Sequence, residues 1–140
     1  MKVVIDTSVW ISALLTRDGK AREVIRLALL GLIEPQMSEP LFLEYEAVME
    51  REKIRTHCPL EPHEIDELYS TYLSMCRWNE IYYLWRPNLK DVNDDFLIEL
   101  AVASHADAIV TGNRSDLLAG ELRFGFEVLN PVELIERIAP

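Results

Sequence analysis

The sequence predicts an α/β protein, a three-layer α/β/α sandwich with a central parallel sheet of Rossmann-like topology. Short apolar runs typical of buried strands alternate along the chain with segments whose apolar residues recur at helical spacing. Right-handed crossovers place each such helix across the sheet, so the strands become parallel. The chain has 140 residues, the usual size of one domain, and we expect residues 1–140 to form a single domain.

The first half of the chain has two expected strands and two expected helices. They are a strand at 2–5, a helix over 21–32, a short strand around 35–37 and a helix through residue 49. The first strand ends in a polar turn, Asp6-Thr7-Ser8. Gly31 is a stop for the first helix, while Ser38 is an N-cap for the second and Pro40 falls in its first turn.

The second half continues the alternation of helices and strands. The expected elements are a helix over 64–78, a strand at 81–85, a helix from about 91 to 105, strands at 108–110 and 127–129, and a closing helix from 131. We expect the helices at 38–49 and 64–78 to form a hairpin.

Composition excludes several classes of protein. The net charge of −10 argues against sequence-independent coating of nucleic acid by a basic face. No apolar stretch reaches the roughly 18 residues of a membrane span, and the N-terminus has no signal-like segment, so we expect a cytoplasmic protein. Cys58 and Cys76 lack metal-ligand spacing and are interpreted as buried or idle thiols.

Polar side chains follow the apolar strands, where ligands bind in open parallel sheets. They are Asp6, Thr7 and Ser8 after the first strand, and Thr111, Asn113 and Asp116 after the fourth. An acid held at the end of a buried strand is a good metal ligand. The sequence therefore predicts a binding site at the carboxyl edge of the sheet.

Further acids would crowd this edge. Asp91, Asp94 and Asp95 fall at the start of a helix, where capping accounts for one of them but not for all. Together with Asp6 and Glu44 they would repel one another in a shared cleft unless a divalent cation lay among them. Mg²⁺ and Mn²⁺ suit such oxygen ligands and support attack of activated water on phosphodiesters.

Histidines are not needed for this chemistry. His57, His63 and His105 lie outside the loops that follow the strands, so surface or core roles are favoured over a general base.

Four motifs in order resemble the PIN domain family, and the resemblance spans the chain. They are Val4-Ile5-Asp6-Thr7-Ser8-Val9, Ser38-x₅-Glu44, Asp91-x-x-Asp94 followed by Glu99-Leu100-Ala101, and Val110-Thr111-Gly112-Asn113 with Asp116. The similarity is closest to bacterial and archaeal PIN proteins described as toxins of toxin–antitoxin pairs, including the VapC type.

The resemblance implies a Mg²⁺- or Mn²⁺-dependent endoribonuclease that cuts single-stranded RNA and leaves a 3′-hydroxyl and a 5′-phosphate. By position, Asp6, Glu44 and Asp94 match the three core acids, with Asp91 as a second choice in the outer shell or as a cap. Only the resemblance distinguishes Glu44 from the acids around it. A homodimer and a cognate antitoxin that inserts an arm into the acidic groove are also implied.

The fourth acidic position departs from the commoner family pattern. Many members have Thr-Gly-Asp where this chain has Thr111-Gly112-Asn113, whereas others keep Asn and place an Asp three residues later, which matches Asp116. Asn113 then becomes a neutral ligand or substrate contact. The hydroxyls of Thr7, Ser8 and Thr111 could orient water at the metal, and turn formation or capping explains them equally well.

Two other functions compete with the nuclease. A phosphatase of haloacid-dehalogenase type requires a second Asp two residues after the first, where this chain has Ser8. A non-catalytic PIN-like or flavodoxin-like module that binds protein partners lacks the metal site.

Two groups of side chains could contact RNA, with structural roles at least as plausible. The aromatic residues Trp78, Tyr82, Tyr83 and Trp85 suggest base stacking, but a sheet core or dimer contact is favoured. The basic residues Lys20, Arg22, Arg26 and Arg114 could guide phosphate or form a solvated face.

Overall fold

Five parallel strands form the centre of the molecule, as the sequence predicts. The computed structural model describes residues 1–81, 95–112 and 125–138. Within these ranges the strands are β1 (Lys2–Ile5), β2 (Glu34–Met37), β3 (Arg77–Trp78), β4 (Ala108–Val110) and β5 (Glu127–Leu129). They are hydrogen-bonded in the order β3-β2-β1-β4-β5, and every pair is parallel.

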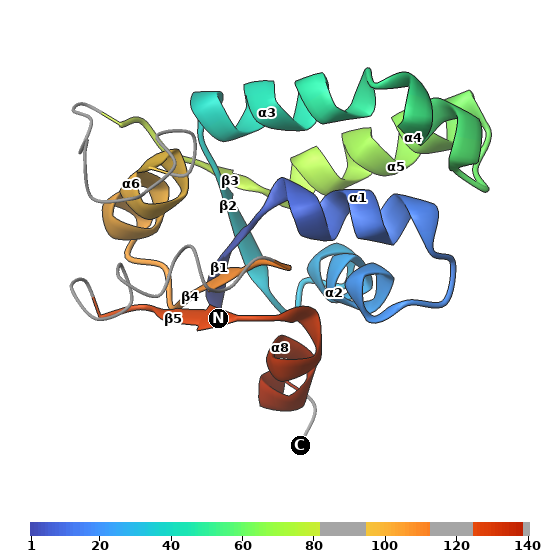
Figure 1. Cartoon of the computed structure of the whole chain (residues 1–140). Helices are drawn as coiled ribbons and strands as arrows, with labels where there is room; N and C mark the ends of the chain where they lie inside the picture. The colour runs from blue at the N-terminus through green and yellow to red at the C-terminus, as the bar shows by residue number, and fades with distance from the viewer. Residues whose placement is uncertain (82–94, 113–124, 139–140) are drawn as a thin grey trace.

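Helices cover both faces of this sheet, which confirms the three-layer α/β/α architecture (Figure 1). The described helices are α1 (Thr7–Leu15), α2 (Lys20–Leu29), α3 (Glu39–Met49), α4 (Glu52–His57), α5 (Pro62–Met75), α6 (Asp95–Ser104) and α8 (Pro131–Ile138). Helices α1 and α2 lie on one side of the sheet and α6 on the other. None of the described helices combines the length and the apolar character that a membrane crossing requires.

Strand order reverses between β1 and β4. From β1 the chain steps outward to β2 and β3, then returns through α6 to β4 on the other side of β1. Helices α1 and α3 begin directly after β1 and β2, whereas α6 ends just before β4 and so begins at the same carboxyl edge. The reversal point and the starts of three helices therefore share one edge of the sheet, where ligands bind in this class of fold.

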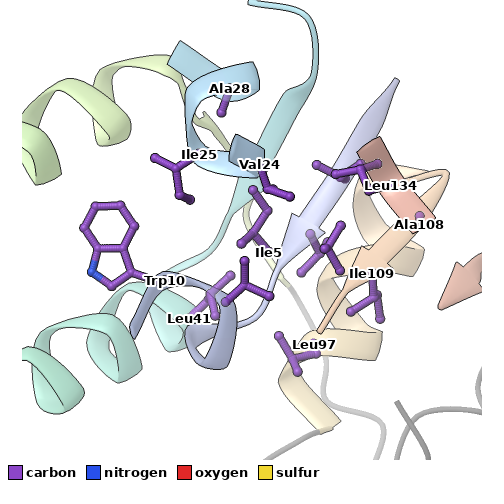
Figure 2. Packing of buried hydrophobic residues seen from close by; sticks show 14 of the residues in the cluster. Ile5, Trp10, Val24, Ile25, Ala28, Leu41, Leu97, Ala108, Ile109 and Leu134 are labelled. Atoms are coloured by element: carbon purple, nitrogen blue, oxygen red, sulfur yellow. The ribbon is translucent and has the colours of Figure 1, made fainter. Parts of the chain in front are cut away.

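One continuous apolar core holds the layers together. Val3, Val4 and Ile5 of β1 are fully buried, as are Ile109 and Val110 of β4. Figure 2 shows side chains from α1, α2, α3 and α6 gathered around these two strands. Because Val3, Val4 and Ile5 of β1 are buried on both faces of the sheet, this run is continuously apolar rather than alternating.

Helix ends follow the expected chemistry at two positions. Ser38 is the N-cap of α3, and its Oγ accepts a hydrogen bond from the backbone N–H of Leu41 at 3.4 Å. Gly31 has a φ of 77° just after α2, with backbone N–H groups of Gly31 and Leu32 donating back to the last turn. These contacts confirm the predicted cap and the predicted stop.

The structure differs from the predicted elements in three places. Residues 7–15 form α1, where only a polar turn at 6–8 was predicted, and α4 was not predicted. Helix α5 ends at Met75, and Arg77–Trp78 form β3 instead of continuing the helix. Most of the expected strand at 81–85 lies outside the described residues.

The third and fifth helices pack together as expected of a hairpin, although α4 lies between them in the chain. Tyr45 and Phe42 of α3 contact Tyr69 and Tyr72 of α5 through their rings. Trp10 of α1 contacts both tyrosines of α5, with its ring stacked on Tyr72 at a centroid distance of 4.9 Å. This aromatic cluster fixes α1, α3 and α5 against one another.

Candidate functional site

Asp6 lies where β1 ends and α1 begins, at the reversal point of the sheet. Its backbone N–H donates to the carbonyl of Val110 at 2.9 Å, which continues the pairing of β1 with β4. It is the N-cap residue of α1, but its side chain makes no capping hydrogen bond. The carboxylate is therefore positioned at the end of the strand and does not cap the helix.

Hydroxyl groups hold one oxygen of this carboxylate. Thr111 Oγ1 donates to Asp6 Oδ2 at 2.7 Å, and Ser8 Oγ donates to the same oxygen at 3.0 Å. Thr7 Oγ1 approaches the other oxygen, Oδ1, at the longer distance of 3.4 Å. Two short bonds on Oδ2 fix the plane of the carboxylate and leave Oδ1 as the oxygen more available to a ligand.

Ser8 connects Asp6 to the loop after β4. The backbone N–H of Gly112 donates to Ser8 Oγ at 3.0 Å, so the proton of that hydroxyl is free to point at Asp6. A side chain at Gly112 would begin 3.5 Å from the same oxygen, an ordinary contact distance. The first and fourth strand ends are thus joined through Asp6 and Ser8, as the sequence pattern predicts for neighbouring strand ends.

Glu44 lies on α3, which starts at the same edge. It is three residues after Leu41 and four before Val48, both buried, so it flanks the buried stripe of the helix and is itself half-buried. Glu46 and Glu50 are exposed. The helical position relative to the buried stripe is a signal in the sequence that distinguishes Glu44 from these two neighbours without reference to any family.

Four of the predicted site residues lie outside the described part of the chain. They are Asp91, Asp94, Asn113 and Asp116. The described helix α6 begins at Asp95, the residue after Asp94, at the same edge as Asp6. The placement of these four residues stays a prediction.

Glu99 is an acid whose burial the sequence analysis did not identify. It lies on α6 about one turn after Asp95 and is only 5% exposed. Helix α6 packs against β1, β2 and α3, the elements that end or begin beside Asp6. Because burial of a carboxylate is costly, a buried Glu at this position deserves a place among the candidate site residues. In the sequence, the apolar residues on both sides of Glu99 are the signal of its burial.

The described acids do not by themselves make up a complete metal site. Residues 1–81, 95–112 and 125–138 contain no group of three or more His, Cys, Asp or Glu side chains arranged to hold a metal. Within them, Asp6 and Glu44 are the predicted carboxylates, and the remaining predicted acids fall outside. A carboxylate with one oxygen fixed by hydroxyls and the other available is the kind of donor that Mg²⁺ and Mn²⁺ prefer.

The described histidines and cysteines are not at this edge. His57, His63 and His105 are exposed, which agrees with surface roles. Cys58 and Cys76 are both free and half-buried, and the thiol of Cys58 donates to the carbonyl of Leu14 at 3.3 Å. Burial raises the pKa of Cys76 to about 12, so this thiol is inert at neutral pH.

Two candidate RNA contacts have structural partners instead. Arg22 donates from Nε to the carbonyl of Ala13 at 2.8 Å, and from Nη2 to that of Leu14 at 3.3 Å. Trp78 is 50% exposed and packs against Phe42, and Tyr82, Tyr83, Trp85 and Arg114 are outside the described residues. Arg22 thus stabilises the end of α1.

Comparisons with known proteins agree with this architecture. The structure is similar to a chain in the crystal structure of VapBC2 from Rickettsia felis bound to a DNA fragment from their promoter, with a TM-score of 0.56 and 15% sequence identity. The similarity covers 93% of this chain and 98% of that chain. No curated protein matches the sequence significantly. Residues 2–115 match the family described as PIN domain, and the chain therefore belongs to the PIN domain family.

Proposed function

We propose that this protein is a Mg²⁺- or Mn²⁺-dependent endoribonuclease that hydrolyses phosphodiester bonds of single-stranded RNA. The main support is the setting of Asp6 at the reversal point of a PIN fold, with its carboxylate fixed by Thr111 and Ser8. A strand end that only terminates a sheet does not need a carboxylate oriented by two hydroxyls. Membership of the PIN domain family supports the same activity.

In this proposal the acids have one common function, which is to bind the cation. Asp6, Glu44, Asp94 and Asp116 would hold the cation, with Asp91 as an alternative ligand and Asn113 as a neutral one. When bound, the cation supplies the positive charge that lets these acids share a site, and it lowers the pKa of water for attack on phosphorus.

The hydroxyls have a positioning role in this proposal. Thr111 and Ser8 keep Asp6 Oδ2 occupied, so that Oδ1 would be the oxygen that holds the cation. Thr7 approaches Oδ1 weakly and is available to bind water beside the cation. A charged carboxylate that is already oriented does not lose rotamer freedom when the cation binds, which favours affinity.

We further propose that the chain acts in the cytoplasm as the toxin of a toxin–antitoxin pair, as a homodimer inhibited by a cognate antitoxin. The support is the resemblance of its motifs to VapC-type proteins and the similarity of its fold to a chain of a VapBC2 complex. Light scattering on the purified protein tests the dimer, which a strictly monomeric species would contradict.

Replacement of Asp6 by Asn tests the catalytic proposal. The Asn side chain keeps an oxygen for the hydroxyls of Thr111 and Ser8, so the fold is expected to persist, but it loses the charge that binds the cation. Cleavage of a single-stranded RNA with Mn²⁺ should disappear in this variant. Asp66→Asn is the matched control, because Asp66 is an exposed acid on α5, and it should cleave at the wild-type rate. Mn²⁺-dependent cleavage by Asp6→Asn would refute the assignment.

Calorimetry separates the nuclease from the alternative of a non-catalytic binding module. Titration of the metal-free protein with Mn²⁺ should give a binding signal in the wild type and in Asp66→Asn, and none in Asp6→Asn. A module without a metal site would give no signal in any of the three proteins.

A further inference from the structure

The peptide unit that precedes Asp6 is hydrogen-bonded at both ends by different parts of the fold. Its N–H, from Asp6, donates to the carbonyl of Val110 on β4 at 2.9 Å. Its carbonyl, from Ile5, accepts a hydrogen bond from the phenolic OH of Tyr45 on α3 at 2.6 Å. A peptide unit is planar, so two bonds at opposite ends fix its orientation and the position of the next Cα, that of Asp6.

The direction of the proton on Tyr45 is also determined. A carbonyl oxygen can only accept, so Tyr45 must donate its single proton to Ile5. The hydroxyl of Tyr72 lies 3.1 Å from that of Tyr45, and it must therefore be the donor of that second bond. Tyr45 Oη thus has one bond as donor and one as acceptor, with both rings almost fully buried.

Burial shields this pair of tyrosines from water, since Tyr45 is 0% exposed and Tyr72 is 1% exposed. The stacked ring of Trp10 closes the same cluster from α1. Water therefore does not compete with Tyr45 for the carbonyl of Ile5.

Tyr45 directly follows Glu44 in α3. A rigid contact from Tyr45 to the residue before Asp6 therefore sets the position of α3, and with it Glu44, relative to the end of β1. We propose that Tyr45 is a positioning residue of the metal site. Its hydroxyl holds the backbone of Asp6 and that of Glu44 in a fixed position relative to each other, and this inference rests on the proposed function. Neither the motifs nor the acids themselves assign Tyr45 this role.

The test is the affinity for Mn²⁺ of Tyr45→Phe, which keeps the ring and removes only the hydroxyl. Loss of a residue that orients metal ligands costs roughly 10- to 100-fold in metal affinity, and we expect about a tenfold loss here, because Tyr45 acts on the backbone and not on a carboxylate. The affinity is measured by calorimetry on metal-free protein.

Tyr69→Phe is the matched control. Tyr69 belongs to the same aromatic cluster, and its buried hydroxyl has no hydrogen-bond partner within the described parts of the chain. Its removal should leave the Mn²⁺ affinity unchanged. If the hydroxyls of the cluster contribute only to stability, Tyr45→Phe and Tyr69→Phe would lower the melting temperature without a selective change in the affinity for Mn²⁺.

The outcomes separate this inference from the proposed function. Absence of Mn²⁺ binding by the wild type would contradict the metal site itself. Wild-type affinity in Tyr45→Phe, with binding present in the wild type, would overturn the positioning role alone, as would an equal loss in both variants. If Tyr45→Phe is partly unfolded, trimethylamine N-oxide restores the folded state and the titration is repeated in that solvent for all three proteins.

Discussion

Arg22 connects two helices, and its replacement by alanine distinguishes a structural role from a role in binding RNA. Its guanidinium donates to the carbonyls of Ala13 and Leu14, which lie in the last turn of α1. The last carbonyls of a helix have no partner within the helix, and the negative end of the helix dipole favours a cation there. Arg22→Ala removes both bonds and the charge.

The size of the effect follows from these contacts. A hydrogen bond from a charged group contributes about 1.5–3 kcal/mol when well buried, and a cation at a helix C-terminus adds roughly 0.3–1 kcal/mol. Arg22 is only half-buried, and one of its two bonds is long, at 3.3 Å. We therefore expect a loss of about 2 kcal/mol in the free energy of unfolding, or roughly 6–8 °C in melting temperature for a chain of this size.

Urea unfolding and calorimetry measure this loss, with two control variants. Arg22→Lys keeps the charge but cannot donate two bonds in the geometry of a guanidinium, so about half of the loss should remain. Lys20→Ala removes only an exposed ion pair with Glu23 and should change stability by less than about 0.5 kcal/mol. An Arg22→Ala protein with wild-type stability and weakened RNA binding would refute the structural reasoning and restore the phosphate-guiding interpretation.

Three further predictions concern other contacts. Thr111→Val removes the shorter hydroxyl bond to Asp6 and should cost about 1.5–3 kcal/mol in urea unfolding, whereas a loss below about 0.5 kcal/mol would mean that this bond is weak. Burial raises the pKa of Cys76 from 9.0 to about 12 and that of Tyr72 above 10.0, so the unfolded chain loses these protons first. Stability should therefore fall as the pH rises above about 9, and a constant free energy of unfolding up to pH about 11 would contradict this. His105 has a φ of 57° after the last turn of α6, so His105→Gly should raise the free energy of unfolding by about 0.5–1 kcal/mol, and a lower melting temperature would show that the imidazole makes a compensating contact.

The elements with the clearest local signals could be predicted from the sequence. The runs at 2–5, 108–110 and 127–129 are strands with those bounds, because each contains a short apolar stretch that ends at a polar residue, Asp6, Thr111 or Asn130. The cap at Ser38 was equally clear. Parallel strands place their carboxyl ends together, so the edge that carries Asp6 and Thr111 could also be predicted from the sequence.

Helix α1 could not be predicted, for a physical reason. Val9, Trp10, Ala13 and Leu14 are buried against α2, α3 and the aromatic cluster. The residues on the other side are a mixture of small hydroxyl residues, Ser8 and Ser12, and the apolar Ile11 and Leu15, so the contrast between the two faces is too weak for the helical periodicity to be recognised. Strand β3 was missed for a different reason. It consists of two exposed residues at the end of a helix, which is too short a segment to show the periodicity of a strand.

Pairwise contacts within the site depend on strand order, which local pattern does not contain. Thr111 and Asp6 are 105 positions apart, and their side chains meet at 2.7 Å only because β4 pairs with β1 in the register that places Val110 beside Ile5. With β5 next to β1, the same strands and the same polar ends would satisfy every sequence rule, and Thr111 would lie one strand further from Asp6. The bond from Tyr45 to Ile5 has the same origin. It requires α3 to cross the end of β1, and α3 follows β2, which pairs with β1 on the side opposite to β4. Asp6 and the hydroxyls of Thr7 and Ser8 are thus encoded locally, whereas the hydroxyl of Thr111 is brought to Asp6 by the order of the strands.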